Sequence, residues 1–228
     1  SGYGLTFGLH TRIDDRVQSI SDSVLVGNVY ANRNQIGAVV GSQPFGGEGL
    51  SGTGPKAGGP HYLDRFTRDA VTQCAGVLSN QVDLSSLRSQ LDRAAPHAQA
   101  VESIVLPGPT GELNRLDMLP RSPVLCLGPG DEYVNSQQQA VESLGGTAVA
   151  VRGSLDPENL ESLAGFSAVL WWGDSALGRA YAQALCRRKG PLVPLICDKP
   201  DAAHVLFERH LCVDTTAAGG NASLLAEQ

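Results

Sequence analysis

The chain lacks the features that mark nucleic-acid-binding and membrane proteins. Its 228 residues include 17 lysines and arginines against 23 acidic side chains, a formal net charge of −6. That balance gives no basic surface for nucleic acid. No apolar run approaches the roughly 20 residues that span a bilayer, and the first residues have no secretion-signal pattern. We therefore expect a cytoplasmic protein with no membrane span and no nucleic-acid partner.

Cysteine and histidine do not occur in reactive or metal-binding patterns. The five cysteines are odd in number and widely spaced, without a Cys-x-x-Cys pair, and the five histidines are isolated from one another. These spacings exclude a disulfide framework and a zinc site. Cys126 and Cys197 lie in apolar runs, where a thiol usually behaves as a buried hydrophobe. We expect no catalytic residue and no metal site in this chain.

Glycine, in contrast, is abundant in one segment. Nine of the 27 glycines lie between Gly37 and Gly59, on either side of Phe45. Glycine allows left-handed dihedrals and lets a ligand approach the main chain closely. Glycine-rich runs are also typical of flexible linkers, but here the apolar stretch 23–30 directly precedes the run and predicts a buried strand. The pattern favours a fixed, ligand-binding loop over residues 32–59.

The next segment differs in its predicted secondary structure. From 68 to about 121 the sequence indicates helices and a connecting loop. Leucines recur at helical intervals over 84–91, and Asp83 is placed to cap that helix. The proline and glycine residues at 106–111 predict a turn or loop.

From residue 123 onward, apolar strands alternate with helices. Such repeated units imply a parallel sheet covered by helices on both faces, an α/β, Rossmann-like domain. Trp171 and Trp172 end the third strand and should face opposite sides of the sheet. The predicted strands are 124–127, 147–151, 168–172 and 192–196, and the predicted helices are 132–144, 157–163 and 176–188.

A dinucleotide site is an open alternative for this half. Gly128 and Gly130 follow the first strand, where a phosphate-binding loop would lie. However, Tyr133 occupies the position of the third glycine, and Arg152 stands where an acidic residue would bind the ribose. An arginine could instead bind a 2′-phosphate group. We favour a scaffold without a nucleotide and keep an independent nucleotide-binding module, or a pure assembly domain, as alternatives.

Short motifs at both ends of the chain resemble one family. The first 66 residues contain Gly2-Tyr3-Gly4-Leu5-Thr6, Gly27-Asn28-Val29-Tyr30-Ala31-Asn32-Arg33, Gln43-Pro44-Phe45-Gly46-Gly47, Ser51-Gly52 and Gly54-Pro55-Lys56-Ala57-Gly58-Gly59-Pro60-His61-Tyr62. These motifs resemble the C-terminal part of the aldehyde dehydrogenase catalytic domain. In detail they look like the glutamate semialdehyde (pyrroline-5-carboxylate) dehydrogenase module of the bifunctional proline utilization A flavoenzymes.

The end of the chain resembles the terminal flap of the same family. Phe207-Glu208-Arg209 and the run 213–223 match that flap, and the α/β region before them looks like the extra, non-catalytic domain of the long members. The resemblance implies three parts: a partial catalytic domain at 1–66, a Rossmann-like domain with a helical lead-in at 67–206, and a flap at 207–228.

The resemblance also implies a substrate site and its limits. The amides of Gly37 and Ala38 would bind the substrate α-carboxylate, and Phe45 would pack on its aliphatic part. The nucleophile, the general base, the NAD site and an FAD-containing proline dehydrogenase would lie upstream. We therefore expect a fragment that binds no cofactor and is inactive alone, with the upstream polypeptide and glutamate semialdehyde as partners and self-association through the flap. Peripheral membrane attachment of the parent stays open.

Overall fold

The computed structural model describes residues 2–216 except 68, 77, 79 and 95–98. The chain forms two compact units. The first unit comprises Ser1–Tyr62, Ala98–Leu119 and Phe207–Gln228, and the second comprises Leu63–His97 and Pro120–Leu206. No helix in the described part of the chain is long and apolar enough to cross a membrane.

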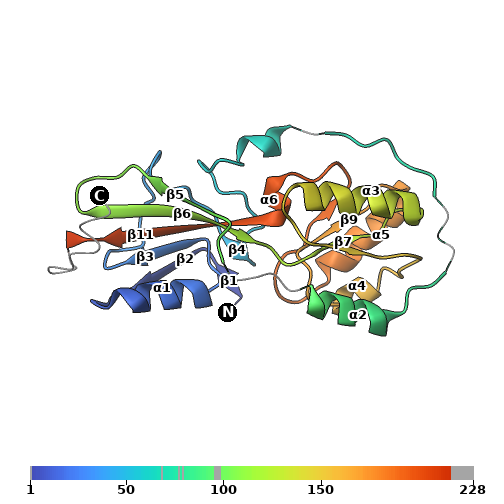
Figure 1. The fold of residues 1–228 in the computed structure, drawn as a ribbon, viewed down its shortest axis with the longest axis horizontal. Helices are drawn as coiled ribbons and strands as arrows, with labels where there is room; N and C mark the ends of the chain where they lie inside the picture. Colours follow the sequence, from blue (N-terminus) through green and yellow to red (C-terminus); the bar gives the residue numbers. More distant parts are fainter. Residues whose placement is uncertain (1, 68, 77, 79, 95–98, 217–228) are drawn as a thin grey trace. The chain divides into compact units, whose positions relative to one another are not determined.

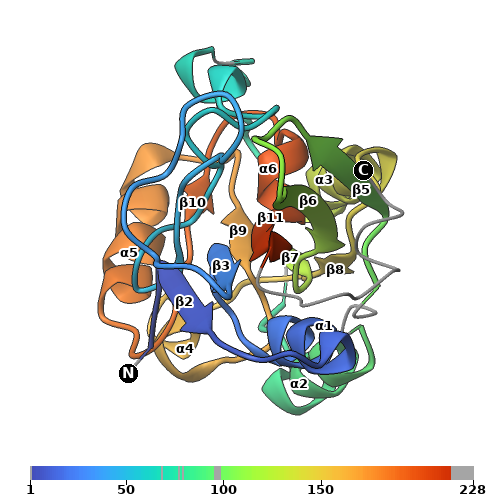
Figure 2. The same cartoon turned by 90° about the vertical axis from the view of Figure 1, so that its left-hand side faces the viewer.

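The first unit is built around a five-stranded sheet with the strand order β2-β3-β11-β6-β5 (Figure 2). Strand β3 pairs in parallel with both β2 and β11, and β5 pairs antiparallel with β6. The elements are β2 (Thr6–Leu9), α1 (Asp14–Ser23), β3 (Asn28–Ala31), β5 (Glu102–Leu106), β6 (Glu112–Pro120) and β11 (Leu206–Asp214), with a two-stranded ribbon of β1 (Tyr3–Gly4) and β4 (Glu48–Gly49).

The central strands of this unit are buried in its apolar core. Val29 and Leu211 are buried on β3 and β11 and pack in one cluster with Val17 of α1. All four residues of β3 are buried, in keeping with a strand that has neighbours on both sides. The strand predicted at 23–30 is confirmed only from residue 28, because residue 23 ends helix α1 and the chain between them is irregular.

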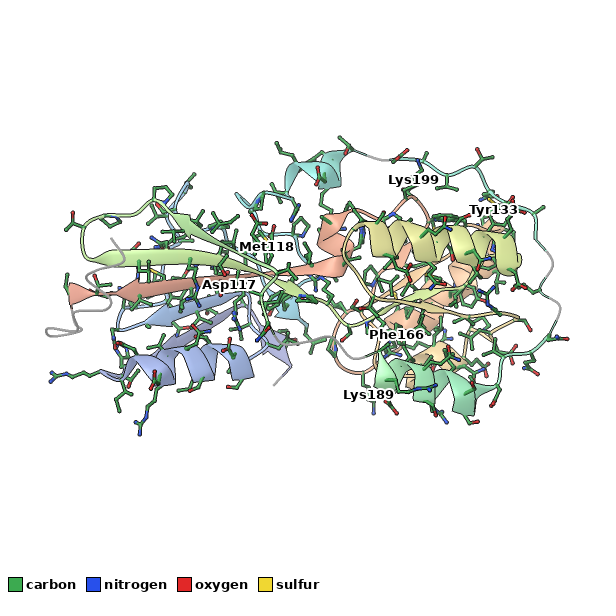
Figure 3. The ribbon with its side chains drawn as sticks, in the orientation of Figure 1. Asp117, Met118, Tyr133, Phe166, Lys189 and Lys199 are labelled. Carbon is green, nitrogen blue, oxygen red and sulfur yellow. The ribbon has the colours of Figure 1, made fainter. Side chains whose placement is uncertain are left out.

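A buried arginine ties helix α1 to the sheet. Arg209 on β11 donates hydrogen bonds to the Ser21 carbonyl oxygen at 2.7 Å and to Asp22 Oδ1 at 2.8 Å. Its guanidinium also lies 3.5 Å from Asp117 Oδ2 on β6 (Figure 3). Since a buried charge is tolerated only with such partners, these contacts fix the end of α1 against β11.

The hairpin of β5 and β6 contradicts one prediction. Residues 102–106 and 112–120 are strands, whereas the sequence indicated helices and a loop up to about residue 121. The turn at 107–111 lies where a loop was predicted, with Gly111 at φ +86°. Strand β6 was missed because it is buried on both faces and so lacks the alternating pattern of a half-buried strand. The hairpin, up to Leu119, belongs to the first unit.

The second unit confirms the predicted alternation of strands and helices. Its four strands are parallel in the order β10-β9-β7-β8. The strands are β7 (Val124–Cys126), β8 (Ala148–Ala150), β9 (Ala168–Leu170) and β10 (Leu195–Ile196). The helices are α2 (Leu84–Arg93), α3 (Gly130–Ser143), α4 (Asn159–Ser162), α5 (Ser175–Cys186) and α6 (Ala202–Val205), with a 3₁₀ turn, η1, at Leu63–Phe66.

Helices cover both faces of this sheet (Figure 1). One apolar cluster contains residues of α2, α4 and α5, and the other contains residues of α3 and α6. Trp171 belongs to the first cluster and Trp172 to the second, as the alternation of a strand predicts. The predicted cap is also confirmed, because the Asp83 side chain accepts a hydrogen bond from the Ser85 amide.

Candidate functional site

The glycine-rich segment is a fixed loop rather than a linker. Phe45 and Ala57 pair through two backbone hydrogen bonds of 3.0 and 2.9 Å, so the loop closes on itself. Farther along the loop, Glu48 and Gly49 pair with β1. This pairing orients the half-buried ring of Phe45 on a defined backbone.

Two buried side chains hold the part of the loop around Phe45. Asn28, the first residue of β3, donates to the Pro44 carbonyl oxygen at 2.8 Å and accepts from the Gly46 amide at 3.2 Å. The Lys56 ammonium donates to Asn28 Oδ1 at 3.0 Å and to the Gly46 carbonyl oxygen at 2.6 Å. Asn28 and Lys56 are at most 2% exposed, so this polar cluster is shielded from water.

His210 on β11 extends the cluster across the sheet. Its Nδ1 lies 3.3 Å from the Asn28 amide nitrogen, and its Nε2 lies 3.2 Å from Asn114 Oδ1 on β6. Because the Asn28 nitrogen is a donor, as its bond to Pro44 requires, Nδ1 accepts and Nε2 carries the proton. Burial, with the Lys56 charge next in importance, lowers the pKa of His210 to about 4. The ring is therefore neutral near pH 7.

A carboxylate holds the other part of the loop. Glu112 on β6 forms an ion pair with Arg33 and accepts hydrogen bonds from Gln43 Nε2 and Asn114 Nδ2, both at 2.8 Å. Gln43 Oε1 in turn accepts from the Val39 amide at 3.2 Å. The loop between residues 33 and 43 is thus fastened at both ends to one carboxylate.

The three predicted substrate-binding residues lie on this loop. Gly37 is exposed and has φ +78°, a dihedral that favours glycine. The amides of Gly37 and Ala38 donate no hydrogen bond to any residue that the structure describes. A pair of unpaired N–H groups is a suitable receptor for an oxyanion. The roles of Gly37, Ala38 and Phe45 stay predictions.

Sequence reasoning missed the residues that support the loop. Asn28 and Lys56 lie inside the quoted motifs, so their presence there was the available signal. Glu112 and His210 lie on strands that approach the loop only in the fold, and nothing local in the sequence indicated them.

Burial disfavours the thiolate form of three cysteines. All five are free, and burial is the main cause that raises the pKa of Cys126 and of Cys212 to about 12. Cys197 is exposed, contrary to the expectation of a buried hydrophobe, because it follows the last residue of β10 as the chain leaves the sheet. Burial nevertheless raises its pKa. No cluster of metal ligands occurs among the described residues.

The second unit does not fit a dinucleotide at the predicted loop. The Gly128 amide donates to Gln137 Oε1, and Gln137 Nε2 donates back to the Gly128 carbonyl oxygen, both at 2.9 Å. The amide that would bind a phosphate is therefore already paired. Arg152 is engaged by Asn135 Oδ1 at 2.7 Å and lies 3.5 Å from Asp131.

An extended segment also covers part of the carboxyl edge of this sheet. The Cys74 amide donates to the Trp172 carbonyl oxygen at 2.9 Å. A Cβ placed on Gly76 would overlap the Pro129 carbonyl group, so the two backbones touch. Tyr133 on α3 packs in the same cluster as Cys74 (Figure 3). Nucleotides bind at this edge in open α/β sheets, and here protein backbone occupies the part of the edge beside Pro129.

These contacts predict that the chain does not bind NAD or NADP. Isothermal titration calorimetry with either nucleotide should show no saturable heat. The Arg152→Ala variant, which removes the side chain best suited to a 2′-phosphate at this loop, should behave like the wild-type chain. Saturable binding that disappears in Arg152→Ala would contradict the expectation.

Comparison with known proteins agrees with the motifs. Residues 1–71 match the aldehyde dehydrogenase family model. The 1-pyrroline-5-carboxylate dehydrogenase of Bacillus cereus (strain B4264) is 51% identical over 61 residues, which cover 27% of this chain and 12% of that protein. The first part of the chain is thus similar to a portion of an aldehyde dehydrogenase.

The whole chain has longer relatives. It is 38% identical to the bifunctional protein PutA of Escherichia coli (strain K12) and 37% identical to that of Rhizobium meliloti, in each case over 99% of its length. It covers only 21% and 22% of those proteins. The chain is therefore homologous to about a fifth of the bifunctional proline utilization A proteins, as the motifs predicted.

A solved structure supports the fold alone. Proline utilization A from Corynebacterium freiburgense superimposes with a TM-score of 0.55 at 23% identity, over 93% of this chain and 23% of that one. This likeness confirms the α/β fold class expected from the sequence.

Proposed function

We propose that this chain supplies the substrate anchor of an NAD-dependent L-glutamate γ-semialdehyde dehydrogenase within a bifunctional enzyme that converts proline to glutamate. The observation that carries the proposal is the pair of unpaired amides at Gly37, which is exposed, and Ala38, which is half-buried, on a loop held from β3, β6 and β11. The amides bind the α-carboxylate of the semialdehyde, and Phe45 contacts its methylene carbons.

The chemistry in this proposal comes from other parts of a longer polypeptide. That polypeptide contributes the nucleophilic cysteine, the general base, the NAD site and a proline dehydrogenase with FAD, since the residues that the structure describes in this chain fit none of these roles. Bound NAD would supply the hydride acceptor for oxidation of the aldehyde. The second unit acts as a non-catalytic lid or scaffold domain, and the end of the chain takes part in self-association.

The surface beside the anchor supports a partner from the same polypeptide. Ile36 is 82% exposed and Val40 is fully exposed, although both side chains are large and apolar. Apolar side chains gathered at an exposed site commonly mark an interface. In the proposed enzyme, the upstream part of the catalytic domain covers them.

The test compares the chain with the full-length polypeptide. The purified chain, supplied with glutamate semialdehyde and NAD, should produce no NADH, and the full-length polypeptide should produce it at a measurable rate, followed by absorbance at 340 nm. Turnover by the chain alone would contradict the assignment of the chemistry to another part. Absence of turnover by the full-length polypeptide would contradict the proposed substrate.

A further inference from the structure

The hairpin of β5 and β6 lies outside the residues that match the aldehyde dehydrogenase family. It nevertheless contacts the loop at 33–43, which carries the Gly37 and Ala38 amides and is called the anchor loop below. The family match ends at residue 71, and Glu112 is the first residue of β6. Its carboxylate accepts a hydrogen bond from Gln43, 69 residues earlier in the sequence. A strand from outside the matched region therefore supports the proposed site.

Glu112 fastens the chain on both sides of the two anchor amides. Arg33 precedes them and pairs with the Glu112 carboxylate. Gln43 follows them and donates to Glu112 Oε1 at 2.8 Å. Hydrogen bonds to a charged group are about twice as strong as those between neutral groups.

Gln43 transmits this restraint to the backbone beside Ala38. Its side chain is 3% exposed, and its Oε1 accepts the amide hydrogen of Val39, the residue after Ala38. The Val39 carbonyl oxygen accepts from the Gln43 amide at 2.9 Å, which closes a turn. Ala38 is thus joined directly to this turn, whereas a Cβ on Gly37 would meet no atom within 4 Å.

We propose that Glu112, acting through Gln43 and Arg33, is a positioning residue that sets the specificity of the anchor for a substrate carboxylate. The proposal rests on the proposed function. Neither Glu112 nor Gln43 touches the substrate in this scheme. They hold the Gly37 and Ala38 amides in the arrangement that a carboxylate requires, so that binding does not have to order the loop. Preorganisation of this kind improves affinity by lowering the cost of ordering.

The test uses kinetics of the full-length polypeptide and two variants. Glu112→Gln keeps an acceptor for Gln43 but removes the charge that pairs with Arg33. Gln43→Met keeps the side-chain length but removes the side-chain hydrogen bonds of Gln43, including those with Val39 and Glu112. We expect the KM for glutamate semialdehyde and the inhibition constant of glutarate, a non-reactive dicarboxylate, to rise about tenfold, which corresponds to one charge-assisted hydrogen bond. The kcat and the KM for NAD should stay within about twofold.

Two controls separate positioning from loss of fold. Glu102→Gln changes an exposed carboxylate on the neighbouring strand β5 and should leave every constant at its wild-type value. The double variant should raise the semialdehyde KM by less than the product of the two single effects, because the substitutions share the contact between Gln43 and Glu112. Thermal unfolding of each variant checks that it is folded at the assay temperature.

The outcomes decide between the positioning role and the proposed function. An active wild-type enzyme whose semialdehyde KM is unchanged in both folded variants would overturn the positioning role alone. A parallel rise in the KM for NAD would also overturn it, since a general distortion would then explain the loss. A wild-type polypeptide that does not oxidise the semialdehyde would overturn the proposed function and this role with it.

Discussion

Substitution of Gly27 by alanine is expected to lower the free energy of unfolding by about 3 kcal/mol, because overpacking and lost buried hydrogen bonds would act together. The new Cβ would overlap the Gly46 carbonyl oxygen and lie 2.6 Å from the Lys56 ammonium nitrogen. Gly27 cannot move away easily. Its amide donates to the Gly4 carbonyl oxygen, and its own carbonyl accepts from the His210 amide, both at 2.9 Å.

The neighbours of Gly27 cannot move away without losing buried hydrogen bonds. Gly46 is bonded through its amide to Asn28 and through its carbonyl to Lys56, and all of these groups are part of the buried cluster. Relief of the overlap would therefore leave a buried polar atom unpaired.

Urea unfolding followed by circular dichroism would measure the effect. The matched control is Gly41→Ala on the same loop, where a Cβ meets nothing within 4 Å and only the dihedral, φ +88°, opposes the change. We expect that control to cost about 1 kcal/mol. Equal stability of the two variants would show that the Gly46 carbonyl group does not exclude a Cβ at Gly27.

The second unit could be predicted because its signals are local. Each strand of its sheet is a short continuous apolar run, and each of the first three is followed by a helix that the sequence predicts, while Asp83 marks the start of α2. Parallel pairing then follows from the order of the elements. The positions of Trp171 and Trp172 on opposite faces needed nothing beyond the alternation of a strand.

The first unit could be predicted only in part, because its sheet joins three distant segments. The run that resembled a terminal flap begins with β11, which lies between β3 and β6 in the middle of the sheet. Strand β6 shows no alternation, since both of its faces are covered. Non-local pairing of this kind leaves no periodic mark in the sequence.

The glycine-rich loop could be predicted from the sequence, whereas the residues that support it could not. Glycine density and the position of Phe45 in the sequence were enough to indicate a shaped loop. The residues that support the loop gave no such signal, because the contact of Asn28 with His210 joins residues 182 positions apart. A buried polar residue is hard to recognise in a sequence unless its partners are near it in the chain.

Acidification is expected to destabilise the chain through His210. In the unfolded chain the imidazole takes up a proton near its ordinary pKa of 6.5, while in the folded chain the pKa is about 4. Between these values the unfolded state binds more protons, so stability is full above pH 6.5 and falls as the pH decreases toward 4. The shift corresponds to about 3 kcal/mol. A proton on Nδ1 would face the Asn28 amide donor and lie near the Lys56 charge.

Urea unfolding at several pH values from 7.5 to 4.5 would measure this loss. The His210→Gln variant should show a shallower pH dependence than the wild type, because it lacks the titrating ring, whereas His10→Gln at an exposed position should keep the wild-type slope. Lys56→Met should raise the pKa of His210, observable by NMR titration of the ring, since the ammonium is the second cause of its depression. Identical slopes in the wild type and His210→Gln would mean that the ring accepts its proton without disturbing the strands that hold the loop.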